Sequence, residues 1–429
     1  MDRTYIKDLK ENIGKKVKIN GFVQAIRDQG GMVFLIVRDQ SGFDQTIVKK
    51  DTEGAFNIAK DLTLESVIEI IGTVEKVEQA PNGVELKIEE IKVLSKAVPE
   101  LPIPVIEEKS GGETDVTKRL DYRWIDLRKP EKKKIFEVWT ELEKGFRNYF
   151  YENGYTQLYT PSFMKTASET GADVFEVKYF EEKAYLAQSP QFYKQMAIAS
   201  GIEKVFIMGP VFRAEPSFTT RHMTEFTGWD IEISYIDSHE DVMDELERII
   251  VSGFEQLKKS GIEVEVPSTP FPRITMEEAK EKLENAGIKG KREYDLSAEE
   301  EIALSELIKK DKGHDFVFLT DWPIGGRPFY HMRYEDNPKL TKSFDLLYKG
   351  LEIVTGAQRE HRYDVLVSQA KEAGMDLKSL EDYLNFFKYG CPPHGGVGMG
   401  PARLIMKILD ISSVKDATFL PRDVKRLTP

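Results

Sequence analysis

Five β-rich runs lie within residues 1–98, and their spacing limits what the N-terminal part of the chain can become. Gly-Gly, Ser-Gly and Pro-Asn-Gly signals separate the runs, and one helical stretch occurs near residues 54–61. Short strands divided by tight turns predict a small β barrel, of which several types exist. The runs are, in chain order, KVKINGFVQAI, MVFLIVRD, FDQTIVKK, SVIEIIGTVEKV and VELKIEEIKVL.

A five-stranded Greek-key barrel of the OB type fits this pattern, and such barrels often bind single-stranded nucleic acid. The stretch VPELPIPVIEE follows and predicts a linker, because prolines deny ladder hydrogen bonds and favour extended backbone. At 429 residues the chain is also too long for one ordinary core. We expect a barrel at 1–98, a linker or hinge at 99–130, and a larger domain at 131–429 with a small insertion at about 260–315.

The larger domain is predicted to be α+β, with a largely antiparallel sheet flanked by helices. Consecutive strand patterns at 205–215 and 225–236 are joined by a polar loop, which favours antiparallel pairing. The helical patterns lie at 131–152, 239–260, 276–287, 297–310 and 363–388. The other strand patterns lie at 155–160, 175–187, 315–320, 344–354 and 395–400.

Composition restricts the functional class only weakly. The net charge of −12 argues against a protein that coats nucleic acid, but it permits a local basic face. Such faces could form at Lys15, Lys16 and Lys18, or these residues could simply be solvated. No apolar run of membrane-spanning length occurs, and the N-terminus lacks the core of a signal peptide. A single cysteine, Cys391, excludes an internal disulfide, and we expect a cytoplasmic protein without membrane partners.

A pair of strand patterns places polar groups together. Arg213 and Glu215 would share one face of the first strand. On the return strand Phe226, Asp230 and other alternate residues would share a face. Trp229, Ile231 and the residues that alternate with that set would form core. Two acids on one face are costly to bury without a compensating charge, so this face predicts a ligand platform. For one Arg-x-Glu pair alone, a salt-bridged strand pair explains the pattern better.

Glycines alternate with Val397 and Met399 in the segment GVGMGPARLIMKIL at 396–409. One face of this strand would therefore carry no side chains, and a flat group such as a purine could lie against the backbone. Pro401 suits the first turn of a following helix, which places Arg403 near that face. Tight packing or a bulge would account for the glycines equally well. Because the glycines lie within the strand, they do not form a dinucleotide-binding fingerprint.

The segment QSPQFYKQ begins another helix, with Ser189 as its N-cap and Pro190 in its first turn. Gln191 and Lys194 then occupy neighbouring positions of one helix face. By itself this lysine would be ordinary helix surface.

Together these segments resemble the class II aminoacyl-tRNA synthetases, and most closely the aspartyl type of compact archaeal and eukaryotic form. The segment GYTQLYTP at 154–161 resembles motif 1, which forms the dimer in that family; the two segments with Arg213 and Arg403 resemble motifs 2 and 3. RLDYRWIDLR at 119–128 and the terminal FLPRDVKRLTP extend the similarity over nearly the whole chain. The resemblance implies ATP-dependent activation of L-aspartate, its transfer to tRNA, Mg²⁺ as cofactor, and a homodimer.

In this family Arg213, Glu352 and Arg403 would be the catalytic residues. Arg213 would bind the α-phosphate and the carboxylate of aspartate, and Phe226 and Arg403 would sandwich the adenine. Glu352, helped by Thr355, would hold Mg²⁺ against the phosphates. The remaining residues implied to bind ATP are Glu215, Arg221, His222, Met223, Gly400, Pro401 and Ala402.

The resemblance also assigns the aspartate pocket. Lys194 and Arg359 would bind the side-chain carboxylate, whereas Glu169 and Asp230 would attract the ammonium group. The further residues implied here are Gln191, Arg213 and Thr355. Asparagine would leave two buried cations underpaired, which gives discrimination of roughly 10⁴-fold or better.

Two positions depart from the family pattern. Ala402 stands where motif 3 usually has glutamate, so one contact is expected to be missing. Thr170 replaces a frequent glycine in the mobile segment SETGADVF, which could stiffen closure over aspartate.

The barrel is expected to hold the anticodon, with Phe34 stacking on a base, Gln45 reading the central uridine and Arg27 nearby. Gln24 stands where strictly aspartate-specific archaeal relatives tend to carry tryptophan, and Pro81 lies in a loop that resembles that of relaxed relatives. These features favour a non-discriminating enzyme that also charges tRNA-Asn.

Three alternatives remain from the sequence. An asparaginyl-tRNA synthetase or an ammonia-dependent asparagine synthetase would use a similar catalytic core, but the asparaginyl relatives lack the lysine at position 194, and the asparagine synthetase lacks the barrel. A non-enzymatic regulator would be expected to lose charged residues such as Arg213 and Arg359, which are intact here.

Overall fold

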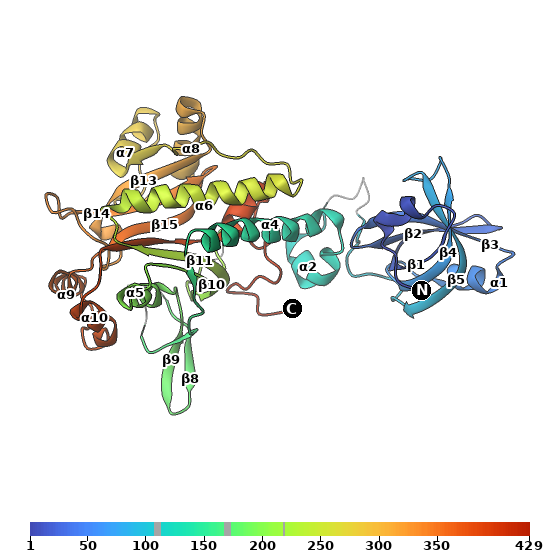
Figure 1. Ribbon diagram of the computed structural model, residues 1–429, viewed down its shortest axis with the longest axis horizontal. Coiled ribbons are helices and arrows are strands. Elements are labelled where there is room, and N and C mark those ends of the chain that lie inside the picture. The colour runs from blue at the N-terminus through green and yellow to red at the C-terminus, as the bar shows by residue number, and fades with distance from the viewer. Residues whose placement is uncertain (107–112, 167–172, 218) are drawn as a thin grey trace. The chain divides into compact units, whose positions relative to one another are not determined.

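The computed structural model describes residues 1–106, 113–166, 173–217 and 219–429 (Figure 1). The chain divides into two compact units, Met1–Asp126 and Leu127–Pro429. Within the described ranges, every helix is too short or too polar to span a lipid bilayer. The predicted boundaries at 98 and 130 stay predictions.

The first unit contains a closed five-stranded barrel with the strand order β1-β2-β3-β5-β4. Strands β3 and β5 pair in parallel, and the other neighbours are antiparallel. The predicted five-stranded barrel is therefore confirmed. Its strands are β1 (Lys16–Asp28), β2 (Met32–Asp39), β3 (Gly42–Lys49), β4 (Val67–Lys76) and β5 (Val84–Ser95).

Side chains of the barrel alternate between its interior and its surface. In β2, Val33, Leu35 and Val37 are fully buried, whereas Phe34 between them is only half-buried. Because strand side chains have a period of two, one face fills the core while the other stays available. The 3₁₀-helix η1 (Ile6–Asn12) and helix α1 (Glu53–Asp61) add apolar residues to this core.

Two short helices precede the second unit, α2 (Val116–Asp121) and α3 (Arg123–Asp126). Asp115 caps α2 by accepting hydrogen bonds from two backbone N–H groups, which satisfies donors left open at a helix start. Ile103 and Val105 from the proline-rich stretch pack with Ile125 in a small separate core. Part of the predicted linker is thus packed rather than extended in solvent.

The second unit is built on an eight-stranded sheet with the order β12-β13-β14-β15-β16-β11-β10-β6. Only β6–β10 and β12–β13 pair in parallel, so the predicted α+β domain with a mainly antiparallel sheet is confirmed. The strands are β6 (Thr156–Gln157), β10 (Lys204–Phe212), β11 (Glu225–Ser234), β12 (Arg273–Thr275), β13 (Phe316–Pro323), β14 (Leu340–Tyr348), β15 (Leu351–Arg359) and β16 (His394–Met399).

Two long helices, α4 (Pro130–Glu152) and α6 (His239–Lys259), cover one face of this sheet (Figure 1). They approach closely because glycines face each other: a Cβ on Gly145 would lie 2.9 Å from the Cα of Gly253. Apolar residues of both helices join Trp229, Ile231 and other strand residues in the main core. This packing leaves the opposite face of the sheet for other groups.

The remaining helices lie at several places around the sheet (Figure 1), and the helix that begins at Pro401 adds Leu404 and Ile405 to the main core. Predicted residues 363–388 form two helices rather than one, because the chain turns at Gly374, whose φ is +73°. A small sheet of β7 (Phe163–Met164), β9 (Glu182–Leu186) and β8 (Glu176–Tyr179) stands apart. The helices are α5 (Gln191–Ala199), α7 (Met276–Asn285), α8 (Ala298–Lys312), α9 (Tyr363–Glu372), α10 (Glu381–Lys388) and α11 (Pro401–Ile408).

Candidate functional site

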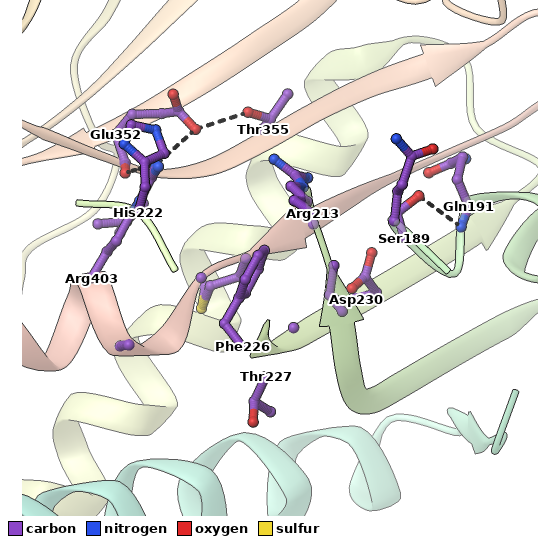
Figure 2. A pocket seen from close by; sticks show the side chains of 18 of the residues that line it. Ser189, Gln191, Arg213, His222, Phe226, Thr227, Asp230, Glu352, Thr355 and Arg403 are labelled. Carbon is purple, nitrogen blue, oxygen red and sulfur yellow. Dashed lines mark hydrogen bonds and ion pairs between the residues drawn. The ribbon is translucent and has the colours of Figure 1, made fainter. Parts of the chain in front are cut away.

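A cavity of about 380 Å³ opens over the polar face of the eight-stranded sheet. Its walls come from β11, β15 and β16, from the segment before α5, from the loop between β10 and β11, and from the start of α11. Figure 2 shows that side chains from these separate segments converge on one space. The predicted residues in its lining are Gln191, Arg213, Glu215, Arg221, His222, Met223, Phe226, Asp230, Glu352, Thr355, Arg359, Gly400, Ala402 and Arg403.

Strand β11 divides its side chains as the alternation predicts. Phe226 and Asp230 line the cavity, whereas Trp229 and Ile231 are buried in the main core on the other side. Arg213 lies just past the end of β10 at Phe212, and its backbone N–H donates to Thr224 O at 2.8 Å. The guanidinium carbon of Arg213 lies 5.5 Å from the ring centre of Phe226, so the cation and the aromatic ring form one wall.

The glycine strand β16 lies between β11 and β15 in the centre of the sheet. A Cβ on Gly396 would lie 2.1 Å from the carbonyl oxygen of Ile231, and one on Gly398 would lie 3.2 Å from Oδ1 of Asp230. Glycine is therefore required at 396 for packing, while Gly398 leaves the cavity floor bare beside Asp230. Pro401 begins α11, as predicted, which places Arg403 in its first turn.

Buried charges lie beneath and beside this floor. The Nζ of Lys194 is 2.9 Å from Oδ1 of Asp230 and 3.4 Å from Oε2 of Glu232, and it donates to Val397 O at 2.9 Å. Arg359 donates from Nε to Oε1 of Glu232 at 2.9 Å. The two cations thus share Glu232, and all four side chains are nearly inaccessible to water.

The carboxylates of this network respond differently to burial. Burial raises the pKa of Asp230, although the Lys194 ammonium opposes the rise. Burial would also raise the pKa of Glu232, but the charges of Arg359 and Lys194 outweigh it, and its pKa is lowered. Glu232 is therefore a fixed anion at neutral pH, and it holds both cations in place.

His331 also contacts Arg359, and its role was not predicted from the sequence. Its Nε2 lies 3.0 Å from Nη1 of Arg359. Burial lowers the pKa of His331 well below its usual range, and the Arg359 charge adds to this effect, so the neutral ring accepts this hydrogen bond. Nη2 of Arg359 also donates to Gly396 O at 3.0 Å. Three acceptors therefore orient one guanidinium at the cavity wall.

The two cations assigned to the aspartate side chain differ in position. Arg359 lines the cavity, whereas Lys194 is not among the described residues that line it. Lys194 lies behind Asp230, which takes its Nζ as a partner. The lysine therefore meets the cavity only through that carboxylate, which pairs with a cation that would otherwise be costly to bury.

A second charged cluster surrounds Glu352 at the other end of the cavity (Figure 2). Its Oε1 is 3.2 Å from Nη1 of Arg403 and accepts from Oγ1 of Thr355 at 3.2 Å. Burial would raise the pKa of Glu352, but Arg403 and Arg327 outweigh it and lower the pKa. Glu352 is therefore ionised at neutral pH.

Asp345 of β14 belongs to the same cluster and was not predicted. It pairs in register with Thr355, and Arg327 donates to its Oδ2 at 2.7 Å. Burial raises the pKa of Asp345 to about 6 although Arg327 opposes the rise. Its Oδ1 is buried and has no hydrogen-bond partner within the described residues. The sequence signal was weak, because Asp345 is flanked by Phe344 and Leu346 in a strand that otherwise resembles core.

Hard oxygen donors such as these suit Mg²⁺, which in proteins is commonly held by one or two carboxylates together with substrate phosphates. The orphaned Oδ1 of Asp345 and the ionised Glu352 fit that requirement. Within the described ranges no group of three or more metal-ligating side chains could hold an ion alone. Phosphate oxygens and water would therefore complete the coordination.

Arg221 and His222 line the wall near Glu352. Burial lowers the pKa of His222, and the nearby Arg403 charge lowers it further. Its Nδ1 lies 2.6 Å from Oγ1 of Thr219. A neutral histidine and an arginine at this wall suit an anionic ligand.

Some predicted residues lie elsewhere. Pro401 is buried at the start of α11 and is not among the described lining residues. Glu169 and Thr170 fall outside the described residues, so their predicted roles have no structural counterpart here.

The predicted anticodon residues lie on the outer side of the barrel. Arg27 and Phe34 are direct partners across β1 and β2. Gln45 donates to Oε2 of Glu85 on β5. Gln24 occurs where the β1–β2 register shifts, and its Oε1 accepts from Nη1 of Arg38 at 3.3 Å.

Pro81 is exposed in the turn between β4 and β5. All five residues thus belong to one small unit whose interior is already filled by apolar side chains. Base recognition would have to use the half-buried and exposed side chains on its surface.

Comparison with known proteins gives matches along the whole chain. A family model described as tRNA synthetases class II (D, K and N) matches residues 115–424, and an OB-fold nucleic acid binding domain model matches residues 17–94. The aspartate–tRNA(Asp/Asn) ligase of Aeropyrum pernix is 43% identical, over 97% of this chain and 96% of that protein. The aspartate–tRNA(Asp) ligase of Pyrococcus abyssi is 41% identical, over 99% of both.

Solved structures agree with these matches. The asparaginyl-tRNA synthetase of Pyrococcus horikoshii, complexed with asparaginyl-adenylate, superimposes with a TM-score of 0.91 at 32% identity and covers 100% of both chains. The aspartyl-tRNA synthetase of Entamoeba histolytica gives a TM-score of 0.90 at 32% identity, over 100% of this chain and 93% of that one.

Proposed function

The chain belongs to the class II tRNA synthetases of the D, K and N group, and from this premise we propose that it is an aspartate–tRNA ligase. It uses ATP to convert L-aspartate to aspartyl-adenylate and transfers the aspartyl group to tRNA. Relatives that are 40–43% identical over nearly the whole chain carry aspartate in their names. Solved structures of the asparaginyl enzymes have the same fold, so the amino acid must be argued from the cavity.

The observation that supports aspartate is the cationic end of the cavity. Arg359 presents its guanidinium there, oriented by Glu232, His331 and Gly396 O, and Lys194 lies directly behind Asp230. An incoming carboxylate would pair with Arg359 and compete with Asp230 for Lys194. Asparagine brings no charge to these cations, and lysine would bring a repulsive one. Aspartate therefore fits best.

We assign the chemistry to positioning and charge stabilisation rather than to acid–base catalysis. Arg213 would hold the carboxylate of aspartate and the α-phosphate of ATP, so that one carboxylate oxygen attacks phosphorus in line with the departing pyrophosphate. Phe226 would stack under the adenine and Arg403 over it. Gly398 leaves room for the nucleotide against the strand backbone.

Mg²⁺ is proposed to be held by Glu352 with the help of Asp345 and Thr355, and when bound it neutralises phosphate charge. The ionised Glu352 and the unpartnered Oδ1 of Asp345 support this, within the described residues. Arg221 and His222 would contact the outer phosphates from the wall near Glu352.

The barrel is proposed to bind the anticodon through Phe34, Gln45 and Arg27, with relaxed reading of the first anticodon base. Gln24 is small and polar, and Arg38 holds it in the irregular part of β1. A tryptophan there would fill space that glutamine leaves open. Pro81 lacks a side-chain donor for a base. These features support charging of both tRNA-Asp and tRNA-Asn, as the Aeropyrum pernix relative's name states for that enzyme.

A homodimer in the cytoplasm is proposed as the working form. Residues 154–161 resemble the dimer motif of the family, and three aromatic side chains near them are exposed: Tyr151, Tyr159 and Phe163 are 57%, 83% and 52% exposed. Aromatic residues are enriched in protein–protein interfaces, so these exposed rings support a dimer contact here.

The deciding experiment is pyrophosphate exchange with aspartate, asparagine and lysine in parallel, followed by charging of purified tRNA-Asp and tRNA-Asn transcripts. Exchange with aspartate alone is expected, and both transcripts should be charged. Exchange with asparagine alone would replace this function by the asparaginyl one. Exchange with aspartate but no charging of either transcript would favour an asparagine synthetase-like enzyme.

A further inference from the structure

Arg221, which lines the cavity, is held by a residue of a distant helix. Its Nη1 donates to Oε2 of Glu301 at 2.8 Å, across 80 residues of sequence. Glu301 lies in the first turn of α8 (Ala298–Lys312), within the region predicted to be a small insertion. The side chains of Arg221 and Glu301 are only 21% and 12% exposed, so solvent screens this ion pair weakly.

The position of helix α8 allows the ion pair between Arg221 and Glu301 to form. Ser297 and Glu300 make a capping box at its start, which fixes the direction of the first turn. A Cβ on Gly350, in the turn between β14 and β15, would lie 2.9 Å from the Cα of Ile302. The helix therefore rests directly on that turn. The carbonyl oxygen of Gly350 also accepts from Nη2 of Arg221, at 3.4 Å.

The surroundings of Glu301 make its carboxylate costly to bury unless its ion pair with Arg221 has a role. Burial raises the pKa of Glu301 to about 7; the Arg221 charge opposes this rise, whereas the negative charge of Glu352 adds to it. Arg403 also faces Glu301, and so does Lys407 of α11. A buried acid beside a wall that is to receive a triphosphate is unfavourable unless it holds a cation in a useful place.

We propose that Glu301 is a positioning residue for ATP, which acts by holding the guanidinium of Arg221 against the cavity wall where the outer phosphates bind. The inference rests on the proposed function and deepens it. Glu301 and Gly350 O occupy one N–H of each Nη atom and leave other N–H groups for the phosphates. An arginine restrained in this way loses less side-chain entropy when ATP binds.

The competing explanation is that the ion pair only tethers α8 to the sheet. That role would change stability without distinguishing between substrates. If Glu301 instead positions Arg221, substitution of Glu301 should raise KM for ATP without raising KM for aspartate. Positioning also predicts that the effect disappears when Arg221 is removed, because Glu301 would then have nothing to position.

The test compares Glu301→Gln, which keeps the shape but loses the charge, with Glu306→Gln, an exposed acid on the same helix. In pyrophosphate exchange, Glu301→Gln should raise KM for ATP about fivefold or more, because a charge-assisted hydrogen bond is lost. KM for aspartate and the midpoint of thermal unfolding should stay close to those of Glu306→Gln. Glu301→Asp, which keeps the charge on a shorter stem, should give an intermediate KM for ATP.

The same pair is then measured in an Arg221→Ala background. Glu301→Gln should add less than about twofold there. An unchanged or lower KM for ATP in the single variant would overturn the inference, as would a full additive effect in the double variant or an equal rise in both KM values.

Calorimetric titration with a non-hydrolysable ATP analogue separates this inference from the proposed function. If the wild-type chain showed no aspartate-dependent exchange, the proposed function would fail. The weaker binding of the analogue to Glu301→Gln than to Glu306→Gln would still be measurable, and equal affinities would overturn the role of Glu301.

Discussion

The barrel and the eight-stranded sheet differ in where the side chains proposed to be functional lie. In the barrel, apolar residues fill the interior, and the residues proposed to meet tRNA lie on the outer side, where they contribute little to the core. In the sheet, the cavity floor is built on buried ions such as Lys194 and Glu232, whose pairing is part of the fold itself. Stability and function should therefore separate in the barrel and be coupled in the sheet.

The sharpest test of this coupling is Lys194→Met, which leaves Asp230 and Glu232 with one cation fewer. Aspartate activation should fall by about 10³-fold or more, and the free energy of unfolding by about 3–5 kcal/mol. ATP affinity should be roughly preserved. Pyrophosphate exchange, ATP titration and denaturant unfolding measure the three quantities.

The matched control is Lys183→Met, a lysine whose side chain is 72% exposed. Normal aspartate turnover in Lys194→Met would contradict the assigned role. Loss of activity with unchanged stability would break the proposed coupling.

In the barrel the corresponding test is Phe34→Ala. Removal of one stacking ring should lower kcat/KM for tRNA charging about 10- to 100-fold, because base–aromatic stacking contributes about 1–3 kcal/mol. Pyrophosphate exchange and the unfolding midpoint should hardly change, since Phe34 lies outside the barrel core. Phe43→Ala, at a side chain that is 42% exposed on β3, is the control. An equal loss in both variants, or a loss of exchange, would show that function and stability are not separable there.

A smaller effect is expected from Gln24→Trp. The larger ring should obstruct the relaxed reading of the first anticodon base, so that charging of tRNA-Asn falls about tenfold relative to tRNA-Asp. The ratio of the two kcat/KM values for transcripts is the measurement, with Gln40→Trp as a control in the β2–β3 turn. An unchanged ratio would remove Gln24 from the specificity argument.

The last prediction concerns acid, and it affects stability rather than tRNA charging. All six histidines lie in the second unit, and burial lowers the pKa of His239 from 6.5 to about 4, although Asp321 opposes the shift. Between these values the unfolded chain binds more protons than the folded one, so the contribution of His239 to stability falls as the pH drops from about 6.5 to 4. His239→Gln should therefore flatten the dependence of unfolding free energy on pH by up to about one proton equivalent. A slope unchanged from that of the wild type would contradict this assignment.

Local periodicity explains which features could be predicted. The five runs of the barrel and the alternation of Phe226 and Asp230 with Trp229 and Ile231 follow from a side-chain period of two, which needs no knowledge of distant residues. The glycine strand and the position of Pro401 at the start of α11 could also be predicted from local sequence patterns. The predicted helix at 363–388 was wrong in its length, because apolar residues continue through the turn at Gly374.

By itself the sequence determined the barrel, the sheet and most of the residues that line the cavity. Strand patterns and motifs are formed by residues that are close together in the chain, so they can be recognised without the tertiary structure. Only the tertiary structure decided how the charges are paired. Lys194 lies behind Asp230, Asp345 stands beside Glu352, and Glu301 reaches Arg221 because segments far apart in the chain are brought together. A carboxylate has the same appearance in a sequence whether it is solvated or buried, and the energy that separates those states depends on its neighbours in space.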